Sequence, residues 1–474
     1  MLFPTIEFAV FFLVVLTLSW LFMPYPRIWK VFIIFASFLF YGYADLRFIA
    51  LLATAIFVNY FGAVAIGRTE NQRARKTALT LTLIANLGLL AWFKYYGFFV
   101  SSFLAAAENF NIAPSIPLLQ IILPVGISFF LFQGISYVVD VYRREYPVCG
   151  FMNVAIYLSF FPHLVAGPIV RAREFMPQLA TPRSPRAIPA TPALFLIAGG
   201  FAKKILLADL IGLDLVDPVF GSPTAFSSFD VALAILGYSA QIYLDFSGYT
   251  DIAIGTAMLL GFWFPQNFNR PYTAASLQDF WRRWHMTLSR WLRDYLYIPL
   301  GGNKKGKLRT ALNIFITMLL GGLWHGATWN FVLWGGLQGA GLVTERSLTA
   351  RRLKKGNAPA GAWPKGLSIL VVFLFVTFAW VLFRAPDLTT AAAVVSQLWL
   401  GIGQPTTLVT FSVLVVVAVG LGLQWIPPRF WQSLQRRYAR MPLVVQGVGM
   451  GLFVVVVTSL IGQRGVAPFI YFQF

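Results

Sequence analysis

The chain contains three histidines, His163, His285 and His325, and each lies in a segment of unusual composition. His325 stands in Gly321-Gly-Leu-Trp-His-Gly-Ala-Thr-Trp329, inside an apolar stretch that is typical of a membrane-spanning helix. Ionisable groups are costly at that depth and usually serve a function there. A neutral imidazole in a dry site can take a proton from a hydroxyl or thiol that attacks an activated carbonyl. The sequence therefore indicates acyl transfer.

Small and aromatic residues surround His325. The neighbouring glycines allow close approach of backbone or ligand, and we expect Trp324, Trp329 and Trp334 to form an aromatic wall. Asn330 offers an amide donor. Because no G-x-S-x-G nucleophile elbow is evident, we expect His325 to act directly as a base and not within a serine triad.

Metal binding is the main chemical alternative for the three imidazoles. Their spacings of 122 and 40 residues contain no local ligand pair such as H-x-x-x-H. The single cysteine, Cys149, excludes an internal disulfide and a multi-cysteine metal site. We therefore expect no metal and no bound cofactor.

Two apolar segments carry signals of interrupted helices. Prolines and a glycine surround His163 in residues 160–168, which favours a kinked or re-entrant segment with His163 as a hydrogen-bonded core residue. Asp245 and Asp251 flank Gly248 in a second such segment. Their six-residue separation does not put both carboxylates on one helical face. We expect them to neutralise Lys or Arg residues that face the bundle interior.

Residues 267–309 form a basic and aromatic interval. A helix from Leu277 would carry His285 beside an apolar face made of Trp281, Trp284, Leu288, Trp291 and Tyr295. Ser276 and Asp279 give it a capping-box start, and Pro299, Gly301 and Gly302 end it. Such a helix suits the cytoplasmic membrane surface, where it would contact lipids. An anchoring role alone does not account for the histidine.

The composition sets the fold class. With 58% hydrophobic, 17% aromatic and 11% charged residues, the chain is predicted to be an all-α polytopic membrane bundle. Its apolar runs do not alternate with polar residues, so they suit helices and not barrel strands. A length of ~20 residues per crossing gives roughly ten or eleven crossings or part-crossings. We expect residues 1–474 to form one membrane domain, whose first apolar run is a retained helix and not a signal peptide.

The net charge of +20 has a membrane explanation. Basic residues mark cytoplasmic loops, and connections rich in Lys and Arg alternate with connections that have few. This pattern predicts a consistent topology and no nucleic-acid partner. Six segments hold 31 of the 37 Lys and Arg, namely residues 27–30, 68–76, 143–186, 270–309, 346–365 and 429–440.

Eight motifs cover most of residues 120–340, namely residues 123–130, 137–143, 161–171, 245–251, 264–272, 280–285, 291–303 and 322–326. Together they resemble the motifs of the membrane-bound O-acyltransferases, in particular the bacterial branch that acts in alginate O-acetylation. This segment is therefore the expected catalytic core. Gln338 stands where the family pattern would have a further histidine.

The resemblance implies that His325 is the catalytic histidine and His285 a second active-site histidine, in a bundle with a central tunnel. It implies a bacterial cytoplasmic (inner) membrane enzyme that uses acetyl-CoA, works with an SGNH-type periplasmic or surface acetyltransferase, and serves a polysaccharide biosynthesis or export complex. The acceptor stays open among alginate, cellulose, another exopolysaccharide and peptidoglycan. We predict substrate contacts from Trp324, Asn330, Trp281, Trp284, Lys304 and Lys305.

Other functions remain open at this point. Within the same family, D-alanine could pass from a carrier protein to teichoic acid. A transporter or flippase would use the interrupted segments as a substrate path, although the sequence has no evident inverted repeat. A non-catalytic scaffold for polysaccharide export is the third alternative. The basic residues around Lys304 and Lys305 could hold the phosphates of acetyl-CoA or simply fix the loop on the cytoplasmic side.

Overall fold

The computed structural model describes residues 1, 3–112, 114, 116–181, 183–354, 364–465 and 467–470. Within these residues the regular structure is helical and includes no strand, which confirms the all-α expectation. Contacts divide the chain into two compact units, Met1–Ala190 with Thr256–Pro265, and Thr191–Gly255 with Gln266–Phe474. Residues 355–363, within one of the predicted basic segments, lie outside the described residues.

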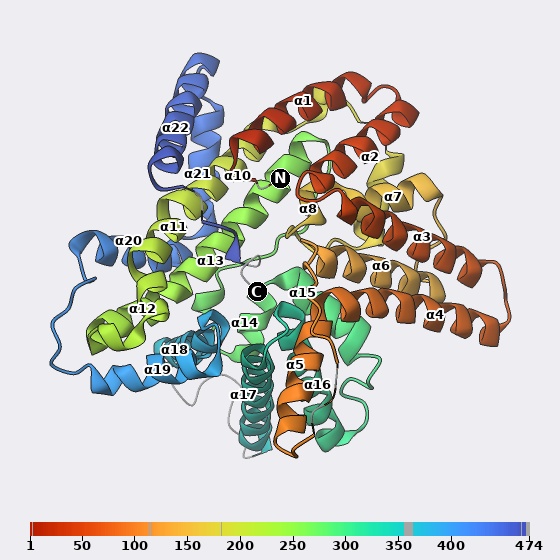
Figure 1. Cartoon of the computed structure of the whole chain (residues 1–474). Helices are drawn as coiled ribbons and strands as arrows, with labels where there is room; N and C mark the ends of the chain where they lie inside the picture. The colour runs from red at the N-terminus through yellow and green to blue at the C-terminus, as the bar shows by residue number, and fades with distance from the viewer. Residues whose placement is uncertain are drawn as a thin grey trace. The chain divides into compact units, whose positions relative to one another are not determined.

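The first unit is a group of apolar helices in which α3, α4 and α6 lie side by side (Figure 1). Buried Asn59 of α3 and Asn86 of α4 exchange two side-chain hydrogen bonds of 2.9 and 3.2 Å, a polar link of the kind that joins membrane helices. Its elements are α1 (Ile6–Phe22), α2 (Pro26–Gly42), α3 (Arg47–Gly67), α4 (Gln72–Leu90), a π-helix (Ala91–Tyr95), α5 (Tyr96–Glu108), α6 (Ile127–Tyr142), α7 (Phe151–Ser159), α8 (Phe161–Leu164), α9 (Ala172–Ala180) and a 3₁₀ turn (Pro185–Ala187).

The second unit contains the long helix α13, whose last residues belong to the first unit, and the antiparallel pair α16 and α17. Its elements are α10 (Ala190–Phe201), η3 (Ala202–Ala208), α11 (Asp209–Ile211), η4 (Gly212–Val216), α12 (Asp217–Gly221), η5 (Pro223–Ala225), α13 (Ser228–Leu259), η6 (Pro271–Thr273), α14 (Leu277–Arg283), α15 (Met286–Leu292), η7 (Arg293–Tyr297), α16 (Gly306–His325), α17 (Trp329–Lys354), α18 (Lys365–Arg384), α19 (Leu388–Leu400), α20 (Phe411–Gly422), η8 (Leu423–Trp425), α21 (Pro428–Ala439) and α22 (Leu443–Arg464).

Several of these helices can cross a membrane. Among the described residues four are long and apolar enough, Arg47–Gly67, Gln72–Glu108, Lys365–Arg384 and Val444–Gly462, and a fifth span would join Phe411–Trp425 with Pro428–Ala439 across a 96° bend. The chain is therefore a multi-pass membrane protein. The ten or eleven crossings or part-crossings and the central tunnel stay predictions, because shorter apolar helices such as α1 and α6 fall below the spanning length.

The segment around His163 is interrupted as expected. Helix α7 ends at Ser159, the four-residue α8 follows, and irregular backbone leads to α9. His163 is fully buried and its Nε2 lies 2.9 Å from the carbonyl oxygen of Tyr157. The interpretation of His163 as a hydrogen-bonded core residue is confirmed.

The expected interruption at Gly248 is wrong, because α13 runs without a break through it. Gly248 instead permits a close helix crossing, since a Cβ there would lie 2.7 Å from the carbonyl oxygen of Gly200 on α10. Two carboxylates of α13, Asp245 and Asp251, are neutralised at the same crossing. Lys203 Nζ lies 2.5 Å from Asp251 Oδ2, and Lys204 Nζ lies 2.7 Å from Asp245 Oδ1.

The Lys204 ammonium is enclosed by two carboxylates. Its side chain is 3% exposed, and Nζ also lies 2.7 Å from Asp209 Oδ1. Asp245 accepts a further bond of 2.8 Å from the backbone N–H of Ile470, so this cluster holds the end of the described chain. These contacts confirm that the Asp245 and Asp251 carboxylates neutralise lysines.

We expect Asp245→Asn to lower the free energy of unfolding by about 3 kcal/mol, because it leaves a buried ammonium with one carboxylate instead of two. The matched Asp251→Asn should cost about 1 kcal/mol or less, since the side chains of its ion pair are 25% exposed. Denaturant titration of both variants in mixed micelles measures the difference. Equal losses would show that burial does not set the strength of these pairs.

Candidate active site

His325 is the last residue of α16 and is enclosed by aromatic rings. It is 4% exposed. The rings of Trp324, Trp334 and Phe383 meet its imidazole edge to face, with centroids 5.0, 5.2 and 5.1 Å away, and Phe331 lies roughly parallel at 6.5 Å. Edge-to-face packing fixes the plane of a ring without filling its nitrogen positions. The helices α16, α17 and α18 thus hold the imidazole in one orientation.

Glycines let α16 and α17 approach closely enough to form this enclosure. A Cβ at Gly322 would collide with the backbone of Phe331 and Gly335, and one at Gly326 would collide with the Phe331 ring. The close approach expected at these glycines is therefore made by the protein's own chain, which brings Phe331 to His325.

His285 does not lie on one continuous helix, so the helix expected from Leu277 is corrected. Ser276 caps α14 as expected, accepting from the N–H of Asp279, but α14 ends at Arg283 and α15 begins at Met286. Between them His285 takes the left-handed conformation, with φ of 39°. It is fully buried.

The rings of Phe246 and Trp324 contact His285, and Trp324 links it to the other candidate histidine. The centroid of Phe246 lies 4.7 Å from that of His285, edge to face, and the centroid of Trp324 lies 5.8 Å away. Trp324 also contacts His325. The fold therefore brings His285 and His325, 40 residues apart in sequence, to the same indole.

Asn267 creates the break that holds His285. Its backbone oxygen accepts from Met286 N at 2.9 Å, and its Oδ1 accepts from Thr287 N at 3.1 Å and Thr287 Oγ1 at 2.9 Å. Oδ1 also lies 3.1 Å from His285 Nδ1. These bonds replace the helical hydrogen bonds that would otherwise continue α14 into α15.

The contacts of Asn267 decide the tautomer of His285. A backbone N–H can only donate, so the Thr287 N–H identifies the contacting atom of Asn267 as the oxygen and not the amide nitrogen. An amide oxygen can only accept, so His285 Nδ1 must carry the proton that it shares with Asn267. In the neutral ring Nε2 then holds the lone pair.

His285 lies between two short helices, outside the four candidate spans. Burial lowers its pKa to about 3, because an imidazolium would lose its hydration there. The ring is therefore neutral at physiological pH, which is the protonation state that the Asn267 contact requires.

Sequence reasoning missed Asn267, although it lies in the family-like segment 264–272. The available signal was an asparagine directly before Phe268 in the family-like motif, since an amide that is buried beside an aromatic residue needs hydrogen-bond partners. What the sequence does not show is that its partners are eighteen and twenty residues away.

Two tryptophans predicted to contact the substrate, Trp281 and Trp284, lie near these histidines but have different contacts. Trp281 Nε1 donates to Gln338 Oε1 at 3.3 Å, and its ring centroid lies 5.8 Å from that of Trp334. Gln338 is fully buried, so the residue that replaces the expected histidine has a structural contact here. Trp284 is 1% exposed and packs on Trp380 at 5.0 Å. Their role toward a substrate stays a prediction.

The remaining predicted residues lie further from the imidazoles or are engaged elsewhere. Asn330 Nδ2 donates to the Ala385 carbonyl oxygen at 2.7 Å, which ties α17 to the end of α18. Trp329 is 54% exposed. Lys304 and Lys305 are exposed before α16, whose twenty residues span about 30 Å, so only an extended donor could contact both them and His325.

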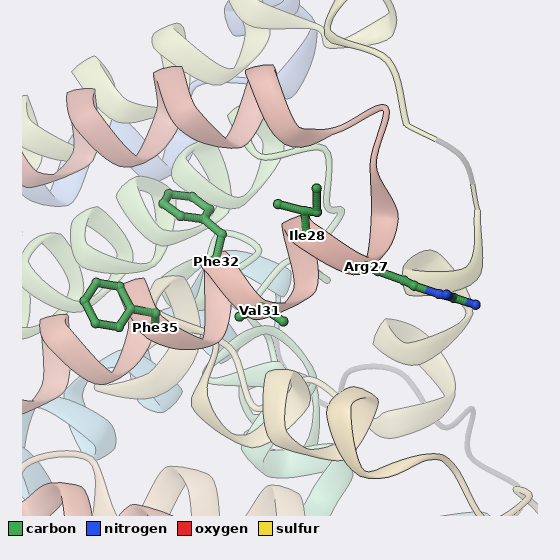
Figure 2. Close-up of a pocket in the computed structure, with 5 residues that line it drawn as sticks. All are labelled: Arg27, Ile28, Val31, Phe32 and Phe35. Atoms are coloured by element: carbon green, nitrogen blue, oxygen red, sulfur yellow. The ribbon is translucent and has the colours of Figure 1, made fainter.

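A shallow apolar hollow lies elsewhere, along α2 of the first unit (Figure 2). It contains none of the predicted site residues. Its lining consists of Arg27, Ile28, Val31, Phe32 and Phe35.

Comparison with known proteins gives a consistent assignment. The family model of the membrane-bound O-acyltransferases matches residues 38–384. The chain is 38% identical over 363 residues to the probable alginate O-acetylase AlgI of Pseudomonas aeruginosa, covering 76% of this chain and 67% of that protein. It is 36% identical over 397 residues to the peptidoglycan O-acetyltransferase of Helicobacter pylori, covering 78% and 73%.

A more distant relative transfers a different group. The chain is 29% identical over 272 residues to the teichoic acid D-alanyltransferase of Bacillus subtilis, which covers 55% of this chain and 68% of that protein. The matched family segment contains both His285 and His325 and extends over the helices that enclose them. The chain therefore belongs to the membrane-bound O-acyltransferase family and is an acyltransferase.

Proposed function

We propose that this protein transfers an acetyl group from acetyl-CoA for the O-acetylation of an extracytoplasmic polysaccharide. The observation that carries the proposal is the pair of buried imidazoles, His285 and His325, on either side of Trp324 in an acyltransferase. The names of the most similar relatives favour acetyl as the group transferred, to alginate in one case and to peptidoglycan in another.

His325 is the proposed general base. Its imidazole takes the proton of the acceptor hydroxyl as that oxygen attacks the thioester carbonyl carbon. The carbon–sulfur bond then breaks, the acetyl group remains on the acceptor oxygen, and the coenzyme A thiolate takes up the proton. The aromatic enclosure supports this role because it orients the ring and limits the access of water.

His285 and Asn267 have a proposed supporting role. With Nδ1–H held by the Asn267 oxygen, Nε2 of His285 is an acceptor that can orient the reacting hydroxyl. His285 would thus touch the substrate, whereas Asn267 acts through His285 as a positioning residue. Trp281, Trp284, Trp324 and Asn330 would complete the substrate environment.

The exposed lysines before α16 are proposed to attract the donor. Lys304 and Lys305 can hold phosphate groups electrostatically, as point charges. The same two lysines also follow the positive-inside rule. Lys304 and Lys305 therefore have two proposed roles, which are to bind acetyl-CoA and to keep this loop on the cytoplasmic side. A donor bound at this position would have to reach along α16 to His325.

The acceptor and partners follow from the same proposal. We place the protein in the cytoplasmic (inner) membrane of a bacterium, with the donor inside and the polysaccharide outside. An exopolysaccharide such as alginate or cellulose, or peptidoglycan, would receive the acetyl group with the help of an SGNH-type acetyltransferase. D-alanyl transfer from a carrier protein is the second candidate, supported by the teichoic acid D-alanyltransferase relative, which matches a smaller part of the chain.

The proposal is tested with purified protein in proteoliposomes. We expect labelled acetyl-CoA to be consumed, and the label to reach polysaccharide when an SGNH-type partner is present. A parallel incubation with a D-alanyl carrier protein in place of acetyl-CoA serves as the alternative arm. Consumption of the carrier thioester alone would replace acetylation by D-alanylation, and consumption of neither would contradict acyl transfer from these donors.

A further inference from the structure

Arg183 lies against two buried aromatic rings in the first unit. Its guanidinium carbon is 3.7 Å from the ring centroid of Trp29 and 4.4 Å from that of Phe262, and both rings are fully buried. Gly261 makes room for the side chain, because it has φ of 84° and a Cβ there would lie 3.1 Å from Arg183 Cδ. A planar cation on aromatic faces is held in a defined orientation.

The surroundings of this arginine are fixed by further hydrogen bonds. Gln178 donates to the Trp263 carbonyl oxygen at 3.0 Å and accepts from Trp263 N at 2.8 Å, which holds the turn that presents Phe262. The Trp29 indole donates to Ser19 Oγ at 2.8 Å. Three segments of the chain thus form a rigid support for one positive charge.

Among the described residues, no carboxylate balances the positive charge of this site. Arg183 Nη1 is buried without a hydrogen-bond acceptor among the described residues. The next residue after Trp29 is a second cation, Lys30, whose Nζ donates to the neutral Asn153 side chain at 2.8 Å. Lys30 directly follows Trp29, on whose ring the Arg183 guanidinium lies, and burial together with the Arg183 charge lowers the pKa of Lys30. In the part of the chain that the structure describes, neither takes part in an ion pair.

We propose that Arg183 and Lys30 form a binding site for a phosphate group. Two neighbouring cations that have no carboxylate partner are stabilised when an anion binds between them. A guanidinium also donates hydrogen bonds whose geometry matches phosphate oxygens. The contact supplies an acceptor for the buried Nη1–H, whose burial is otherwise costly. The rings of Trp29 and Phe262 form the apolar floor beneath the guanidinium.

Two sources of phosphate fit this chemistry. Lys30 and Arg183 belong to two basic segments that the charge pattern puts on the cytoplasmic side, where anionic phospholipids bind basic pockets between helices. The phosphates of coenzyme A are the other source, and that version rests on the proposed use of acetyl-CoA. Both sources place a phosphate on the same two side chains.

The test measures binding to the full-length protein in detergent, without turnover. One arm titrates a short-chain phosphatidylglycerol against the corresponding diacylglycerol, which lacks the phosphate, and the other titrates coenzyme A against pantetheine. Each arm uses Arg183→Met, which keeps an apolar side chain on the rings, and Lys30→Gln, which keeps a donor for Asn153. Arg186→Gln removes an exposed charge from the same loop and is the matched control.

We expect a phosphate-bearing ligand to raise the unfolding midpoint, and its affinity to fall about tenfold in Arg183→Met and in Lys30→Gln but not in Arg186→Gln. A response to phosphatidylglycerol identifies a lipid site, and a response to coenzyme A identifies a donor site. Equal affinities in all variants, or no response in either arm, would overturn the proposal. Acetyl transfer by the unaltered protein, measured separately, tests the proposed function, whereas these binding titrations do not depend on turnover.

Discussion

Replacing His325 with alanine is expected to slow acetyl transfer from acetyl-CoA by about 10²–10⁴-fold, the usual contribution of a positioned general base. The reason is that the substitution removes the imidazole base, and its ring neighbours Trp324, Trp334, Phe383 and Phe331 have side chains that cannot take its place as a base. The measurement is the initial rate of thioester consumption in proteoliposomes at equal amounts of folded protein. His325→Gln, which keeps polarity and similar volume but cannot act as a base, should lose a comparable factor.

His163 provides the matched control in the same chain. It is equally buried, yet it lies in the first unit and its Nε2 contacts the backbone of Tyr157. His163→Gln should lower the unfolding midpoint while the rate per folded molecule changes less than about threefold, since it removes a packing contact and no base. Full activity of His325→Gln would exclude His325 as the base, and a loss in His163→Gln equal to that of His325→Ala would indicate a general structural effect.

Substitutions at Asn267 are expected to change activity through His285. Asn267→Leu removes the acceptor for His285 Nδ1–H and for Thr287 N–H, and should lower the rate by about tenfold to a hundredfold. Asn267→Asp keeps the acceptor but adds a negative charge, which stabilises the imidazolium and raises the pKa of His285 from its low value of about 3. Activity that needs the neutral ring is lost as pH falls through that pKa. The acid limb of the pH–rate profile should therefore lie at higher pH in Asn267→Asp than in the unaltered protein.

The pH profile separates positioning from a structural role. A structural loss would lower activity at every pH, whereas the aspartate variant should recover activity as pH rises and the leucine variant should not. Asn269→Asp places the same charge on an exposed residue two positions along and should leave the profile unchanged. Superimposable profiles for Asn267→Asp and Asn269→Asp would show that Asn267 does not control His285.

Residue type and local spacing allowed part of the site to be predicted. A histidine beside glycines and tryptophans in an apolar run pointed to His325, and its place at the end of α16 agrees with the glycine that follows it. Ser276 and the glycines after Pro299 marked the limits of the 277–299 segment, since capping and turn residues act over a few positions. The pairing of Asp245 and Asp251 with cations also followed from charge alone.

The sequence by itself determined that the chain is a helical membrane protein with few charged residues, because hydrophobicity and the cost of burying a charge are properties of each residue in its solvent. Only the tertiary structure decided whether a helix breaks. At Gly248 the expected break is absent. Close packing against Gly200, together with the ion pairs between lysines and Asp245 and Asp251, stabilises this segment as a continuous helix. At His285 an unexpected break occurs, because Asn267 supplies hydrogen bonds that compete with helical ones. Contacts between residues distant in sequence set both outcomes, and local periodicity contains no information about them.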